Sequence, residues 1–95
     1  MSTSSDFWRV ISLHRKCNQM LQAFPDDESS VRYYTEMQAR SADNATVFWG
    51  CLDEDTKSEI MDDAAINEEH SGNALAIPGL WALMQDWFDG YIASQ

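Results

Sequence analysis

Residues 78–93 read PGLWALMQDWFDGYIA, and this stretch decides the fold class of the chain. When its residues are placed about 100° apart, as on an α-helix, the apolar side chains cover one continuous half of the cylinder. Pro78 suits a first helical turn, so the pattern predicts a helix over 78–93. An apolar face this wide and this aromatic is typical of a helix that packs against two neighbours. The residues of this face are Leu80, Trp81, Leu83, Met84, Trp87, Phe88, Tyr91 and Ile92.

Three segments upstream of this stretch show the same helical spacing of apolar residues. Ser, Asp or Glu side chains lie at the start of each one and can accept hydrogen bonds from the free amides of a first turn. Pro25 ends the first segment and Gly50 ends the second. A break of the second near Ser41–Asn44 is an alternative, because such polar side chains compete for backbone hydrogen bonds. The predicted helices run over 6–24, 28–49 and 54–66.

The remaining pattern completes an all-α prediction. No segment alternates strictly between apolar and polar residues, so strands are not expected. Residues 67–73, which include Ser71-Gly72-Asn73, are typical of a loop. A chain of 95 residues makes one domain with a thin core. We therefore expect a single compact bundle of about four helices over residues 1–95.

The cysteines and the N-terminal residues bear on the compartment. Cys17 and Cys51 each lie within a helical pattern, which favours two buried thiols in a reducing compartment over a disulfide. Residues 1–5 contain no basic region followed by an apolar core, so they do not resemble a secretory signal. No apolar run approaches the roughly 18 residues that a membrane span needs. The sequence thus predicts a cytoplasmic protein that does not contact membranes.

Metal-binding patterns in the sequence are weak. Asp53-Glu54-Asp55 resembles the start of a calcium-binding EF-hand loop, but Lys57 stands at the fifth position and no glycine follows at the sixth. A second group recurs at helical spacing, which is more typical of a solvated helix face than of a cation site. Its members are Glu59, Asp63, Asn67 and His70. We expect no metal and no cofactor.

Catalytic patterns are equally weak. His14 and Cys17 lie three residues apart, but both fall on the apolar face of 6–24, where a core histidine and a core thiol are the ordinary occupants. No Gly-x-Ser-x-Gly elbow and no glycine-rich phosphate loop occurs in the sequence. The sequence therefore favours a binding protein over an enzyme.

Charge is the most informative feature of the composition. Lys and Arg number 6 against 16 Asp and Glu, for a net charge of −10. Residues 1–25 carry a net +2, residues 26–52 a net −3, and residues 53–95 a net −9 with Lys57 as their one base. Such a chain is repelled by nucleic acid and attracted to basic protein surfaces.

Eight carboxylates within residues 53–69 form the predicted interaction site. Carboxylates one turn apart repel one another at a cost of tenths of a kcal/mol per pair, so stability alone does not favour them. Two interpretations stay open: a surface that binds where phosphates would bind, or a solvated face that only confers solubility. The carboxylates belong to Asp53, Glu54, Asp55, Glu59, Asp62, Asp63, Glu68 and Glu69.

Aromatic residues supply a second component of the predicted site. Trp8 falls on the polar side of the 6–24 helix, beside Arg15 and Gln19, and is therefore a candidate anchor for a partner. Tyr33 and Trp49 lie at the margins of the apolar face of 28–49 and are weaker candidates.

The leading hypothesis is an acidic inhibitor that occludes a basic protein surface, such as that of a nuclease or another nucleic-acid-binding protein. In size and charge it is similar to small immunity proteins, antitoxins and phage-encoded anti-defence proteins, although no motif places it among them. One alternative is a homodimer that serves as a structural or adaptor protein. The other is a protein that sequesters a small ligand in a pocket of Trp, Tyr and Arg side chains.

Overall fold

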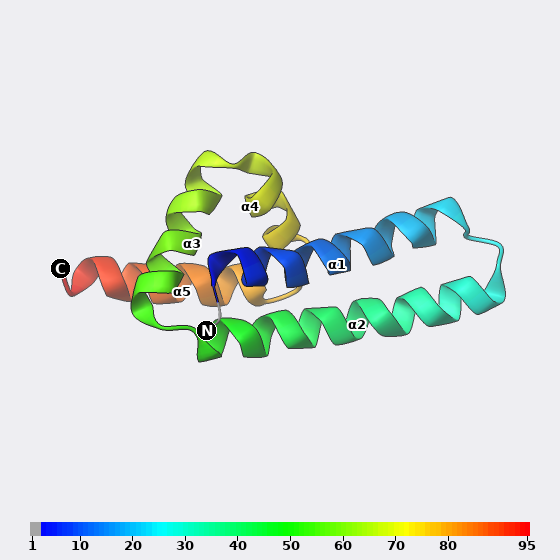
Figure 1. Cartoon of the computed structure of the whole chain (residues 1–95), viewed down its shortest axis with the longest axis horizontal. Helices are drawn as coiled ribbons and strands as arrows, with labels where there is room; N and C mark the ends of the chain where they lie inside the picture. Colours follow the sequence, from blue (N-terminus) through cyan, green and yellow to red (C-terminus); the bar gives the residue numbers. More distant parts are fainter. Residues whose placement is uncertain (1–2) are drawn as a thin grey trace.

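The computed structural model describes residues 3–95, and within them it contains five α-helices and no strands. The all-α prediction is confirmed. The molecule measures 51 × 24 × 21 Å, because the first two helices form a long hairpin that extends beyond the other three (Figure 1). The helices are α1 (Ser4–Ala23), α2 (Glu28–Cys51), α3 (Glu54–Ile66), α4 (Glu68–Leu75) and α5 (Leu80–Ala93).

The α1–α2 hairpin is set by capping side chains at its two helix starts. Thr3 and Asp6 form a reciprocal capping box at the start of α1, in which each side chain accepts from the backbone amide of the other. Asp27 caps α2 by accepting from the amides of Ser29 and Ser30. The alternative break near Ser41–Asn44 does not occur: α2 is continuous there, and the hydroxyl of Ser41 donates to the carbonyl of Gln38 within the helix.

One apolar core joins all five helices. Phe7 and Ile11 of α1 and Ile60 of α3 are fully buried, as are Leu80 and Met84 of α5. They share a cluster with buried residues of α2 and α4. This core fixes α3 and α4 on one side of α1 and holds the start of α5 beneath them. None of the helices that the structure describes is long and apolar enough to cross a membrane.

The segment predicted as the loop 67–73 is largely helical, and this prediction was wrong. Asn67 ends α3 and starts α4, because its side chain accepts from the amides of Glu69 and His70. Gly72 lies within α4, where tertiary packing outweighs its low helix propensity. The last helix starts at Leu80 rather than at Pro78, because Gly79 has a φ of 79° and is not helical.

Two further predictions on side-chain position need correction. Trp8 was expected on the polar side of α1, but it is only 7% exposed because α4, which was not predicted, covers that side. Cys51 was expected to be buried and is exposed, since it lies two residues beyond the buried Trp49 and so faces the other side of α2. Cys17 is buried as predicted, and both thiols are free. Met1 and Ser2 of the segment compared with secretory signals lie outside the described residues.

Candidate functional site: an acidic stripe beside an apolar groove

Three carboxylates and one apolar side chain line the outer face of α3. Asp55, Glu59 and Asp62 are exposed, and Ile66 is 85% exposed at the end of the same face. Their spacing of four, three and four residues keeps them on one side of the helix, with the carboxylates separated by about 6 and about 4.5 Å along its axis. The buried side of α3, with Ile60 and Ala64, points the opposite way. We call Asp55, Glu59, Asp62 and Ile66 the acidic stripe.

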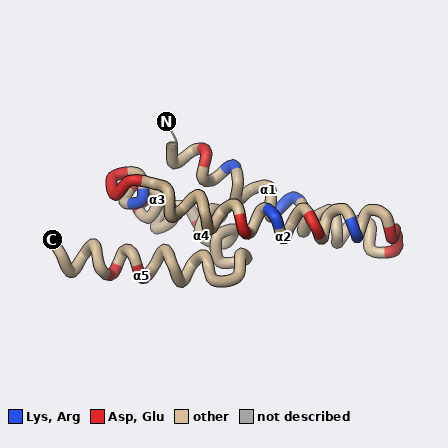
Figure 2. Tube along the Cα trace, turned by 90° about the horizontal axis from the view of Figure 1, so that it is seen from below, with Lys and Arg blue, Asp and Glu red and all other residues tan. Residues whose placement is uncertain are grey.

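Three acids lie at the start of α3: Asp53, Glu54 and Asp55, of which Asp55 also belongs to the acidic stripe. Asp53 is its N-cap, with Oδ1 accepting from the amide of Thr56 at 2.7 Å. Hydrogen bonding with the Thr56 side chain, and second with its backbone amide, lowers the pKa of Asp53, because these bonds stabilise the ionised carboxylate. Glu54 and Asp55 occupy the first turn, where the positive end of the helix dipole favours them. Figure 2 shows acidic residues gathered at this corner and, separately, at the α1–α2 turn.

Two of the predicted site residues make polar contacts within the fold instead. The carboxylate of Asp63 contacts Nδ1 of His70, which ties α3 to α4. Glu69 accepts from the guanidinium of Arg15, which ties α4 to α1. Glu68, by contrast, is exposed in the first turn of α4. Of the eight predicted carboxylates, Asp63 and Glu69 therefore serve to hold the fold.

Trp8, the predicted anchor, belongs to the same internal network. Its indole stacks on the imidazole of His70, with ring centroids 4.3 Å apart and an angle of 17° between the planes. Because His70 also contacts Asp63, the start of α1 and the end of α3 both fix the position of α4. Trp8 is thus a buried residue that helps to position α4, and it is not an exposed anchor for a partner.

The one base of residues 53–95 does not neutralise the stripe. The ammonium of Lys57 lies 5.4 Å from the ring centre of Trp49 and 5.8 Å from that of Trp87. Both are within the range of cation–π attraction. Lys57 therefore lies against the aromatic residues that join α2, α3 and α5, while the stripe on the other side of α3 keeps its charge.

An apolar groove lies next to the stripe, between α3, α4 and α5. It encloses about 340 Å³, at the lower end of the range of about 300–1,000 Å³ for ligand sites. Asp62 belongs both to the stripe and to the rim of this groove. Sequence reasoning missed the groove, although the wide aromatic face of 78–93 was its signal, since α5 has more apolar surface than its neighbours cover. The lining residues are Met61, Asp62, Ala64, Ala65, Ser71, Leu75, Trp81, Gln85 and Phe88.

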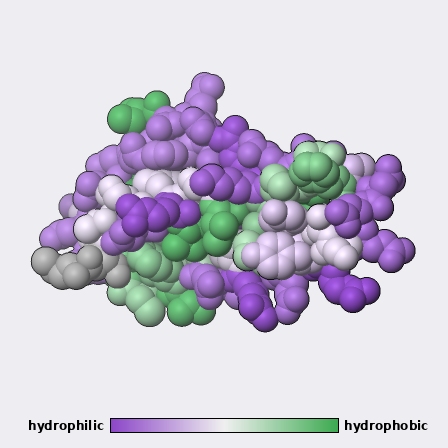
Figure 3. Space-filling view, turned by 45° about the vertical axis from the view of Figure 1, so that its right-hand side comes forward, coloured by the Kyte–Doolittle hydropathy of each residue, from purple (hydrophilic) through white to green (hydrophobic). Residues whose placement is uncertain are grey.

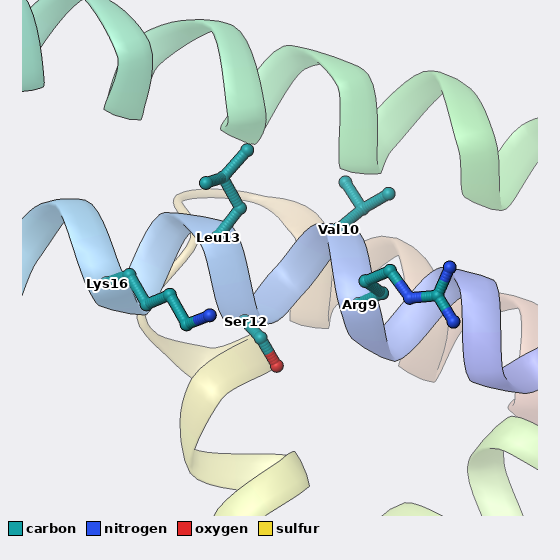
Figure 4. A pocket seen from close by; sticks show the side chains of 5 residues that line it. All are labelled: Arg9, Val10, Ser12, Leu13 and Lys16. Atoms are coloured by element: carbon teal, nitrogen blue, oxygen red, sulfur yellow. The ribbon is translucent and has the colours of Figure 1, made fainter.

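A second hollow of about 560 Å³ runs along α1 and differs in charge (Figure 4). Val10 and Leu13 point toward α2, while Arg9 and Lys16 supply two positive charges. Its lining residues all belong to the segment with a net positive charge. The charge of this hollow is therefore opposite to that of the stripe, and the hollow does not favour a basic ligand.

The described part of the chain offers little for metal or nucleophilic chemistry. Among residues 3–95, no group of three or more His, Cys, Asp or Glu side chains is arranged to hold a metal ion. The helical spacing proposed for Glu59, Asp63, Asn67 and His70 is interrupted, because α3 ends at Ile66. His14 and Cys17 are both buried, and burial lowers the pKa of His14 and raises that of Cys17, which opposes an imidazolium–thiolate pair. Comparisons with protein families, with curated proteins and with solved structures find no match to this chain.

Proposed function

We propose that this protein binds and occludes a basic, nucleic-acid-binding surface of a protein partner. The observation that carries the proposal is the acidic stripe: Asp55, Glu59 and Asp62 are exposed, side by side, and lie away from Lys57. A groove that binds nucleic acid presents Lys and Arg side chains to a row of phosphates. A row of carboxylates on a helix can bind those Lys and Arg side chains in place of the phosphates.

The distribution of ion pairs supports this proposal. The bases of α1 and α2 are partly engaged within the fold, since Arg15 binds Glu69 and Arg40 binds Glu36. The carboxylates of the stripe form no ion pair within residues 3–95, so their charge is free to act on a partner. A surface with a net excess of one sign raises the association rate with an oppositely charged protein. The repulsion among these carboxylates lowers the stability of α3, and it weakens as salt screens the exposed charges.

The test is capture of partners from a lysate of the native host on the immobilised protein, at low and at moderate salt. Captured proteins are identified and purified, and their binding to nucleic acid is measured with and without this protein. We expect a basic protein whose capture falls with salt and whose nucleic acid is displaced. Capture limited to copies of this chain, insensitive to salt, would contradict the proposal.

Charge variants show whether the stripe is responsible. Replacing Asp55→Asn, Glu59→Gln and Asp62→Asn should weaken binding by about tenfold or more, because each exposed charge pair contributes up to about 1 kcal/mol. A matched control makes the same change in net charge on the hairpin and should alter affinity far less. If both variants bind equally well, the stripe is not the binding surface. The control substitutions are Asp26→Asn, Glu28→Gln and Asp43→Asn.

The homodimer is the second candidate, and exposed apolar side chains favour it. Apolar surface lies among hydrophilic residues on the face shown in Figure 3. Dimerisation would make the melting temperature rise with protein concentration. Two copies with a net charge of −10 each repel one another, which is why we place this candidate second. The exposed large apolar residues are Leu13, Phe24, Tyr33, Val47, Ile66, Leu75, Leu83 and Ile92.

A further inference from the structure

The groove between α3, α4 and α5 has an apolar floor, and one acid, Asp62, is among its lining residues. Trp81 and Phe88 of α5 and Met61 of α3 supply apolar side chains, and Leu75 of α4 is 59% exposed at one edge. Asp62 stands at the rim itself. We infer that this groove takes an apolar side chain from a basic helical segment of the partner. The inference rests on the proposed function, because it names the part of the basic partner that docks beside the stripe.

Each of the three helices brings one acid to this side of the molecule. Asp62 comes from α3. On α4, Glu68 shares a face with Ser71 and Leu75, which follow it by three and seven residues. On α5, Asp89 follows Gln85 by one turn and is exposed.

The bases of this region do not counter these acids. The sequences of α4 and α5 contain no Lys or Arg, and Lys57 of α3 lies against two indole rings. An occupant with an apolar anchor and flanking Lys or Arg side chains therefore matches both the floor and the rim. This combination is typical of amphipathic helices that bind in grooves.

A second copy of this chain is the competing occupant, since the α1 hollow combines apolar and basic residues. The net charge of a second copy disfavours it as the occupant of the groove. Arg9 and Lys16 provide two positive charges, whereas each whole chain carries a net charge of −10. A partner with a net positive charge gains from long-range attraction where a second copy meets repulsion.

The experiment uses three synthetic helical peptides of equal length and the ¹⁵N-labelled full chain. The first peptide has Lys residues flanking one Trp and two Leu on a single face. The second has Ala in place of these three residues, and the third has Gln in place of each Lys. Amide chemical shifts locate each peptide, and titration gives its dissociation constant.

We expect the first peptide to shift the amides of Ala65, Ser71 and Gln85, and to bind about tenfold more tightly than the second, because it buries apolar area in the groove. Equal affinity of these two peptides, with shifts confined to Asp55–Asp62, would overturn the groove inference and leave the proposed function standing. Binding of neither charged peptide would overturn both. Equal affinity of the first and third peptides would show that the Lys side chains do not contribute to binding, and it would overturn the inference.

Two exposed apolar residues provide a matched pair of variants. Leu75→Ser should raise the dissociation constant of the first peptide several-fold and leave that of the second peptide unchanged, because Leu75 lines the groove. Val47→Ser alters a side chain that is 66% exposed on α2 and lies outside the groove, and it should change neither affinity. Thermal melts of both variants verify the fold. Equal effects of the two variants, or sedimentation that shows self-association abolished by Leu75→Ser, would overturn the inference.

Discussion

Replacing Glu59 with glutamine and Asp62 with asparagine should weaken binding to a basic partner and also raise the free energy of unfolding. Glu59 lies four residues from Asp55 and from Asp63 and three residues from Asp62, so α3 contains three like-charge pairs at contact spacing. Each such pair destabilises a helix by about 0.2–0.5 kcal/mol at low salt, so the double variant should gain about 0.6–1.5 kcal/mol. The Ser4 hydroxyl donates to Glu59 Oε1 at 3.1 Å and can donate equally to the glutamine oxygen.

Thermal unfolding followed by circular dichroism measures this gain. A change of 1 kcal/mol shifts the melting temperature of a domain this size by about 4–8 °C, so the double variant should melt several degrees higher at low salt. At about 1 M salt the Debye length falls to about 3 Å, and most of the gain should disappear.

A control of opposite sign accompanies this measurement. Glu36→Gln removes the pair with Arg40, whose atoms are 3.0 Å apart, and should lower the melting temperature slightly at low salt. A double variant that melts below the parent at low salt would contradict like-charge repulsion within α3. A gain in melting temperature that is the same at both salt concentrations would contradict it as well. Either result would mean that the stripe stabilises the fold through local contacts and is not spare charge for a partner.

Three further predictions concern the stability of the fold, its pH dependence and the accessibility of the two thiols. His70→Ala should lower the free energy of unfolding by about 1–2 kcal/mol, since it removes a ring stack and a partly buried polar contact with Asp63, and amide exchange in α4 should accelerate more than elsewhere. Burial lowers the pKa of His14, so the unfolded chain takes up a proton there before the folded chain does. Stability should therefore fall as the pH drops below the ordinary histidine pKa, and His14→Gln should flatten that fall in urea titrations between about pH 7 and 5. A thiol reagent should modify Cys51 rapidly and Cys17 only at the rate of opening or unfolding, because Cys51 is exposed and Cys17 buried; Cys51→Ser should abolish the fast phase.

The fold class was predictable because apolar periodicity is a local property of each segment. The wide aromatic face of 78–93 and the limits set by Pro25 and Gly50 determined three helix boundaries to within about two residues. The short helix α4 was missed, since its sequence contains Gly72 and Asn73 and it is held by contacts with α1 and α3. Periodicity within the segment gave no sign of those contacts.

The error over Trp8 follows from the missed helix. A helical projection of α1 shows which residues share a side, but it does not show which sides other helices cover. Phe7 and Ile11 face the core with α2, whereas Trp8 needs α4 to cover it. A tryptophan on an otherwise polar side therefore indicated a second packing surface, and sequence alone did not distinguish this from a partner surface.

The eight carboxylates of the predicted site illustrate what sequence cannot separate. In sequence Asp62 and Asp63 are equivalent neighbours, yet Asp62 stands at the rim of the groove while Asp63 contacts His70. Glu68 and Glu69 divide in the same way, because Glu69 binds Arg15, which is 54 residues away.

In both pairs a step of one residue, about 100° around the helix, turns the second carboxylate toward a neighbouring helix, although Glu69 itself stays exposed. Asp63 and Glu69 connect α4 to α3 and α1, and these contacts hold the frame on which Asp62 and Glu68 lie. Rigidity is useful to a surface that must match charges on a partner, since side chains on an ordered helix lose less entropy on binding. Neutralising Asp63 or Glu69 should therefore lower both the affinity and the melting temperature, whereas neutralising Asp62 should lower the affinity without lowering the melting temperature, because it also removes the repulsion with Glu59.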